Sequence, residues 1–234
     1  MKRLVLFDID GTILNGGKLW RECFEAAFTE IFPEDEICHV AFSGKTDRQI
    51  CREMLPSWVS QHESELKIEQ VLSGYLNRTR DAIADGRTAE VSLLPGVREL
   101  IEELTIQKQI RLGLLTGNVR EGARIKLAAV QLDSFFASGV GAFGDDHWDR
   151  YRLPEIAVRR VQQEYGESYS GKQVVIIGDT VHDVNCGKSI NVRSIAVGTG
   201  RAEHLQEILE ARPDFFFPTL SEKNTVLNAI LQRL

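Results

Sequence analysis

Residues 4–7 and residues 174–177 each carry four consecutive apolar side chains. A strand that is buried on both faces of a parallel sheet has this pattern, because neither face alternates with polar residues. Both runs lead at once into a polar segment that contains glycine and aspartate. We therefore predict two central strands, each of which ends in a polar loop.

Between residues 19 and 85 strand patterns nearly vanish and apolar side chains recur at helical spacing. A proline ends the first of these segments and a glycine follows the last. Thr46 and Gln49 have the spacing of a capping box, which opens a second helix that must end before Pro56. We predict an insertion made of helices. The apolar positions that mark its first and last helices are Trp20, Phe24, Ala27, Phe28 and Ile31, then Ile68, Leu72, Tyr75 and Ile83.

After residue 95 helix and strand patterns alternate, which predicts an α/β fold with a doubly wound, Rossmann-like parallel sheet and helices on both faces. The insertion interrupts this order after the first strand. We therefore predict a core of residues 1–14 and 89–234, and a small α-helical cap domain of residues 15–88. The expected later strands are residues 110–115, 174–177, 194–197 and 215–217, with helices over 97–104 and from about 154.

The composition is that of a globular protein, since 43% of the 234 residues are hydrophobic and 26% are charged. A net charge of −6 leaves no long basic surface, so we expect no nucleic-acid partner. The N-terminal apolar run is too short for a signal peptide or a membrane span. The four cysteines lack metal-ligand spacing and fit reduced thiols. We expect a cytoplasmic protein with no membrane partner, either a monomer or a homodimer.

Four aspartates follow the two most clearly buried strands. Asp8 and Asp10 come directly after residues 4–7, and Asp179 and Asp183 follow residues 174–177. Ligands of open α/β sheets bind beyond the carboxyl ends of the strands, so these acids are expected at one site. Four converging carboxylates repel each other without a cation, and hard oxygen ligands with few histidines nearby favour Mg²⁺ over zinc. The sequence predicts a magnesium site there.

A third strand, residues 110–115, ends in Thr116, Gly117 and Asn118. A hydroxyl group and a glycine amide can approach the oxygens of a phosphate group. We interpret this segment as the binding site for the phosphate group of a small phosphorylated substrate.

These motifs together resemble those of the haloacid dehalogenase-like hydrolases. The resemblance rests on Asp8-x-Asp10-Gly11-Thr12, on Thr116 after an apolar strand, on a basic residue near 150, and on Gly178-Asp179 with Asp183 four residues later. It spans the chain, and the helical insertion between the first two motifs is similar to the small cap of phosphoglycolate phosphatase-like members.

The resemblance implies a phosphatase that works in two steps. Asp8 attacks phosphorus and forms an aspartyl phosphate, while Asp10 protonates the leaving oxygen and later deprotonates the attacking water. Asp8, Asp10 through its backbone carbonyl, Asp179 and Asp183 are the implied metal ligands, with Asp183 either a ligand or a support for one.

The basic residue departs from the usual family pattern of a lysine followed by proline. Here residues 149–154 offer Arg150 and Arg152 and no lysine. An arginine can hold a phosphate and a carboxylate together through its planar group, so we assign the role to Arg150 rather than Arg152. Thr116, Gly117, Asn118 and Arg150 are then the expected substrate-binding residues. Phosphoglycolate is the first substrate to try.

Two alternatives to the phosphatase function stay open. A phosphomutase similar to β-phosphoglucomutase passes the phosphoryl group to a second sugar hydroxyl, and a catalytically idle regulatory protein retains only the phosphate site. Two weaker motifs are rejected: residues 44–46 lack the strand and glycine of a P-loop, and residues 139–144 run into acids that oppose a dinucleotide. Lys45 and Arg48 of the insertion are interpreted as a solvated face rather than anion ligands. Trp20 and Trp58 are interpreted as part of the cap's core.

Overall fold

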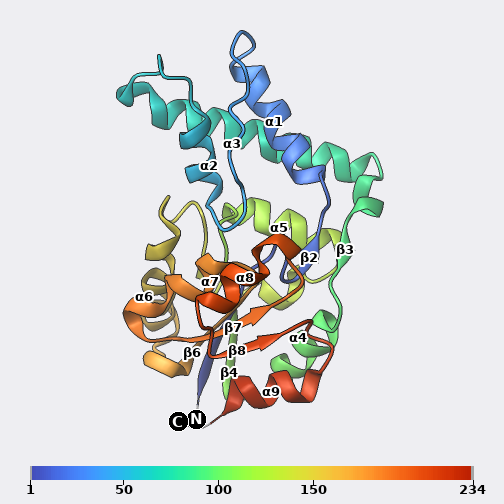
Figure 1. Ribbon diagram of the computed structural model, residues 1–234, viewed down its shortest axis with the longest axis vertical. Helices are drawn as coiled ribbons and strands as arrows, with labels where there is room; N and C mark the ends of the chain where they lie inside the picture. The colour runs from blue at the N-terminus through green and yellow to red at the C-terminus, as the bar shows by residue number, and fades with distance from the viewer. Residues whose placement is uncertain (1, 233–234) are drawn as a thin grey trace.

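The computed structural model describes residues 2–232 and has a six-stranded sheet whose neighbouring strands are all parallel (Figure 1). The spatial order is β5-β4-β1-β6-β7-β8, so the chain winds outward in both directions from β1. The strands are β1 (Arg3–Phe7), β4 (Ile110–Leu115), β5 (Gly141–Ala142), β6 (Val174–Gly178), β7 (Arg193–Val197) and β8 (Phe215–Phe217). The α/β, doubly wound class is confirmed.

Alternate residues of β1 pack against different layers of helices. Val5 and Phe7 lie in a core with α4, α5 and α9, whereas Leu4 and Leu6 lie in a second core with α6. Both faces of the sheet are therefore covered, which explains the uninterrupted apolar runs. The core helices are α4 (Val97–Ile106), α5 (Arg120–Ala129), α6 (Leu153–Tyr165), α7 (Val181–Cys186), α8 (Leu205–Glu210) and α9 (Lys223–Leu231).

The helical cap lies beyond the carboxyl ends of the central strands (Figure 1). It contains α1 (Leu19–Ile31), α2 (Asp47–Met54) and α3 (Gln61–Ala84). Two short strands, β2 (Leu14–Asn15) and β3 (Ser92–Leu93), pair antiparallel where the chain leaves the core and where it returns. The domain boundaries at residues 14/15 and 88/89 stay a prediction, although this pair lies close to both.

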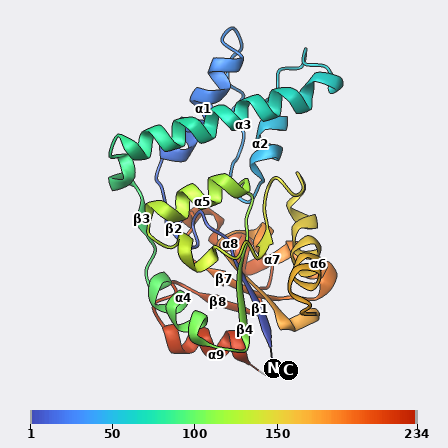
Figure 2. The same cartoon turned by 180° about the vertical axis from the view of Figure 1, so that it is seen from behind.

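The cap packs on the core and does not stand apart from it. Figure 2 shows α3 passing over α5, and the two helices are in contact. Inside the cap the Phe24 and Tyr75 rings lie 5.2 Å apart, and both belong to the same buried cluster as Val5 and Phe7. One continuous apolar core therefore holds the cap over the end of the sheet.

Two expectations about the insertion need correction. Trp58 is 63% exposed and donates its indole N–H to Asp35 Oδ1 (3.0 Å), because it lies in the loop between α2 and α3 and not on a helix face. Thr46 does cap α2 by accepting from the Gln49 backbone N–H (3.0 Å), but the Gln49 side chain donates to Glu53 instead of closing a box. Trp20 is buried, as expected.

In residues 2–232 no helix combines the length and the apolar character that crossing a bilayer requires.

Candidate active site

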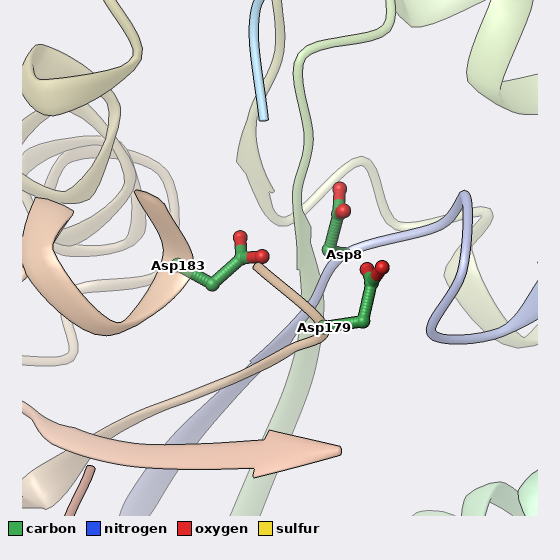
Figure 3. A group of neighbouring side chains, drawn as sticks. All are labelled: Asp8, Asp179 and Asp183. Carbon is green, nitrogen blue, oxygen red and sulfur yellow. The ribbon is translucent and has the colours of Figure 1, made fainter. Parts of the chain in front are cut away.

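Three aspartates meet at the carboxyl end of the sheet (Figure 3). Asp8 follows β1, Asp179 follows β6, and Asp183 projects from the first turn of α7. One carboxylate oxygen from each lies within 4.8 Å of the other two, and all three residues are buried. The sequence placed these residues at one site because parallel neighbouring strands end at the same edge.

The loop after β1 is shaped around Asp179. Thr12 donates its hydroxyl to Asp179 Oδ1 (3.0 Å). Gly11, with φ of +85°, and Gly200 both lie against the same carboxylate, and a Cβ atom at either position would overlap it. Glycine is therefore required at both positions for this carboxylate to keep its place.

Asp183 and Asp8 share a buried cation. Arg150 Nη2 lies 3.2 Å from Asp8 Oδ1 and also pairs with Asp183. Thr180 orients Asp183, because its backbone N–H donates to Asp183 Oδ2 (3.0 Å) and its hydroxyl donates to the same atom (2.6 Å). Arg152 is exposed, whereas Arg150 lies at the site; the phosphate-binding role of Arg150 stays a prediction.

Electrostatics show that this group suits a bound cation. Burial raises the pKa of Asp8 to about 6 against the lowering effect of Arg150, and Asp183 and Asp10 add to the rise. Burial, Asp183 and Asp8 likewise raise the pKa of Asp179 well above its ordinary value. A single arginine therefore does not neutralise the cluster, and the donors are all hard oxygen atoms of the kind that Mg²⁺ prefers. The residues fit a divalent metal of this type.

The Asp10 carboxylate lies outside the three-aspartate group and points to a different set of partners. Its Oδ2 atom accepts from Asn118 Nδ2 (2.8 Å) and from Lys126 Nζ (2.7 Å). Its Oδ1 atom is shielded from solvent and has no hydrogen-bond partner within residues 2–232. The Asp10 carboxylate is therefore not one of the three carboxylates that come together, and a role for its backbone carbonyl as a metal ligand stays a prediction.

The Thr116–Asn118 loop is buried and internally bonded. Thr116 Oγ1 accepts from the Asn118 backbone N–H (3.2 Å) and from Asn118 Nδ2 (2.8 Å). The same amide group reaches Asp10, so Asn118 joins the end of β4 to the loop after β1. The predicted substrate-binding residues of this loop thus lie beside Asp10 and line the same cavity as Asp8.

Helix α2 of the cap docks onto this loop. The Asp47 backbone N–H donates to the Gly117 carbonyl (2.8 Å), and Asp47 Oδ2 accepts from the Val119 N–H (2.9 Å). The approach is so close that a Cβ atom at Gly117 would overlap the Lys45 carbonyl. Thr46 adds a bond from its hydroxyl to the Trp148 carbonyl (2.6 Å). The cap is therefore held against the core at the mouth of the site.

Between the cap and the core lies a cavity of about 700 Å³. Its floor includes Asp8, Asp10 and Arg150, and its cap side includes Trp20 and Tyr75. A cavity of this size with a charged floor and aromatic walls is typical of a small-molecule site.

Lys126 and Asp47 are functional candidates that the sequence analysis missed. Lys126 is buried, and burial acts to lower its pKa, but Asp10, Tyr75 and Asp47 outweigh that effect and raise it. The available signal was a single lysine inside an otherwise apolar stretch, residues 125–130. Asp47 follows the helix-capping residue, where an acid is common, so no signal distinguished it.

The two cap cations are paired with acids of the cap. Arg48 bonds Glu65 (3.0 Å) and Glu69 (2.6 Å), and Lys45 pairs with Glu53 while lining the cavity. Their side chains are only 18% and 20% exposed, so neither residue lies on a freely solvated face, and Lys45 alone of the two lines this cavity.

Comparisons with known proteins place the chain in a family. The sequence model of the haloacid dehalogenase-like hydrolases matches residues 5–197. Pyrophosphatase PpaX of Listeria innocua is 23% identical over 231 residues, which cover 93% of each chain.

Two solved structures share the fold along nearly the whole chain. A predicted phosphoglycolate phosphatase from Haemophilus somnus superposes with a TM-score of 0.67 at 16% identity, covering 97% of this chain and 98% of that one. A β-phosphoglucomutase from Clostridium difficile superposes with a TM-score of 0.69 at 15% identity, covering 98% and 97%. With its acidic cluster at the end of the sheet and a family match over most of its length, the chain belongs to the haloacid dehalogenase-like hydrolases.

Proposed function

We propose that this protein is a magnesium-dependent phosphatase that hydrolyses a small phosphate monoester through an aspartyl phosphate on Asp8. The observation that carries the proposal is the cluster of Asp8, Arg150, Asp179 and Asp183, of which the first three line the cavity, as does Asp10. A nucleophile, a cation and a separate acid are the groups that two-step phosphoryl transfer requires.

In the first step a carboxylate oxygen of Asp8 attacks phosphorus and the bond to the leaving oxygen breaks. The leaving oxygen takes a proton from Asp10, so the alcohol departs neutral. Arg150 neutralises negative charge beside Asp8, and the hydroxyl of Thr116 and the amides of the Gly117 loop offer fixed donors for the phosphoryl oxygens.

In the second step a water molecule attacks phosphorus, and Asp10, now ionised, takes a proton from it. The bond from phosphorus to Asp8 breaks, which releases inorganic phosphate and restores the Asp8 carboxylate and the protonated Asp10.

Asp8, Asp179, the Asp10 carbonyl and Asp183 would hold Mg²⁺, which when bound supplies positive charge next to the transferred phosphoryl group. The remaining work belongs to the chain itself: Thr12 and Thr180 fix the acidic side chains, and the cap excludes bulk water from the cavity.

The leaving group is expected to occupy the cavity under the cap. Phosphoglycolate and sugar phosphates are the first candidates, and inorganic pyrophosphate joins them because of the Listeria relative. The free cysteines Cys23, Cys51 and Cys186 are buried, which suits a cytoplasmic protein.

Phosphate release from such a panel, with Mg²⁺ or with EDTA, tests the proposal. We expect release that needs the metal in the wild type, and a loss of at least about a thousandfold in Asp8→Asn, which keeps the shape but removes the nucleophile. Metal-dependent release that survives in Asp8→Asn contradicts the mechanism. Isomerisation of a sugar phosphate without phosphate release identifies a phosphomutase instead, and phosphate binding without turnover identifies an idle regulatory protein.

A further inference from the structure

Lys126 is a buried lysine that the two-step mechanism above does not use. It lies on α5, its Nζ atom is 2.7 Å from Asp10 Oδ2, and its side chain is 4% exposed. Removing a lysine from water is unfavourable unless its partners compensate. The burial of Lys126 next to the proposed acid therefore indicates that this lysine has a function.

The hydrogen bonds of Asp10 are distributed unevenly between its two oxygen atoms. Lys126 and Asn118 both donate to Oδ2, at 2.7 and 2.8 Å, and Oδ1 has no partner within the described residues. Two donors from different elements, one on α5 and one after β4, fix the plane of the carboxylate. Lys126 and Asn118 therefore set the direction in which the Asp10 side chain, which is 41% exposed and lines the cavity, faces the substrate.

The surroundings of Lys126 come largely from the cap. Its Nζ atom lies 5.2 Å from the centre of the Trp20 ring, and Tyr75 and Asp47 influence it electrostatically. All three belong to the cap, so the lysine that contacts Asp10 is enclosed only while the cap is docked on the core.

We propose that Lys126 is a positioning residue for Asp10: by holding Oδ2 it fixes the orientation in which the carboxyl group meets the leaving oxygen in the first step and the attacking water in the second. The inference rests on the proposed phosphatase function. It also makes the alignment of Asp10 depend on cap residues, which joins cap closure to proton transfer.

Two substrates distinguish the positioning of Asp10 by Lys126 from other roles of this lysine. p-Nitrophenyl phosphate has a leaving group that departs without a proton, so the first step needs no acid, whereas an alkyl phosphate needs Asp10 in both steps. In Lys126→Met we expect kcat for the alkyl substrate to fall about 30- to 100-fold, with KM changed less than about threefold.

With p-nitrophenyl phosphate the same variant is expected to keep a rapid burst of nitrophenolate close to one per enzyme. A slow steady state follows, because hydrolysis of the aspartyl phosphate still needs Asp10 as a base. Lys108→Met, which removes an exposed lysine, is the control and is expected to match the wild type on both substrates.

A second variant keeps the test decisive if Lys126→Met does not fold. Lys126→Arg retains the charge, and because its head group is longer and planar it is expected to shift Asp10 and to show the same split with a smaller loss.

Three results overturn the inference: equal loss of burst and steady state, a rise in KM at unchanged kcat, or turnover at or above the wild-type rate in both variants. Failure of the proposed function is distinct, since the wild type would then release nothing from either substrate.

Discussion

Replacement of Asp47 by asparagine is expected to stabilise the protein at high pH. Burial raises the pKa of Asp47 to about 6 from an ordinary 3.8, although Lys126 and the Val119 N–H act to lower it and Asp10 and Asp145 act to raise it. The charged form is therefore disfavoured in the folded state, and asparagine mimics the neutral form. Its amide oxygen can still accept from Val119, and its backbone N–H still reaches Gly117.

The sign and size of this effect on the free energy of unfolding follow from proton linkage. The folded state binds more protons than the unfolded state between the two pKa values, so stability falls as pH rises from about 4 to 6 and then levels off. The rise of about 2 units in the pKa of Asp47 lowers the free energy of unfolding by about 3 kcal/mol at pH 8, but by only about 0.5 kcal/mol at pH 4. Asp47→Asn is expected to recover about these amounts.

Urea unfolding of wild type and Asp47→Asn at pH 4 and pH 8, in EDTA, measures the difference. Asp81→Asn, an exposed position on α3, is the control and is expected to change stability by less than about 0.5 kcal/mol at both pH values. A variant that is less stable than the wild type at pH 8, or one whose gain is the same at both pH values, refutes the reasoning.

Two further pairs of substitutions test the site and the docking of the cap. Arg150→Met removes the cation that two buried acids share and is expected to lower turnover at least about a hundredfold. Arg152→Met changes an exposed position and is expected to keep turnover within about twofold of the wild type. Equal effects of the two substitutions on phosphate release would contradict the assignment. Gly117→Ala places a methyl group against the Lys45 carbonyl and is expected to destabilise by about 1 to 3 kcal/mol and to slow turnover. In Gly122→Ala on α5 the added methyl group makes only ordinary contacts, and the variant is expected to stabilise the folded protein by about 0.5 to 1 kcal/mol. If thermal unfolding shows Gly117→Ala to be more stable than Gly122→Ala, this account of the interface is refuted.

The strands and the acidic cluster could be predicted from the sequence because local pattern determines both. Residues 4–7 and 174–177 are apolar on both faces, and parallel strands that lie side by side must end at one edge. The sequence therefore predicts that Asp8, Asp179 and Asp183 lie together, and the motif order points to Arg150.

The contacts between cap and core could not be predicted in this way. Lys126 is buried because cap helices cover α5, and the pattern within α5 does not say which cap helix will cover it. Asp47 becomes buried for the same reason, since docking of α2 and not its own neighbours removes it from water. Trp58 was placed in the core because large aromatic residues are usually buried, but its loop leaves it at the surface.

Direct detection of the covalent intermediate tests the central claim. The protein is mixed with Mg²⁺ and a substrate that it turns over, quenched in acid and reduced with borohydride, which converts an aspartyl phosphate to homoserine; the peptide that contains Asp8 is then examined by mass spectrometry. We expect homoserine at residue 8 and at no other aspartate, and none when EDTA replaces the metal. Release of phosphate with Asp8 unmodified would contradict the account.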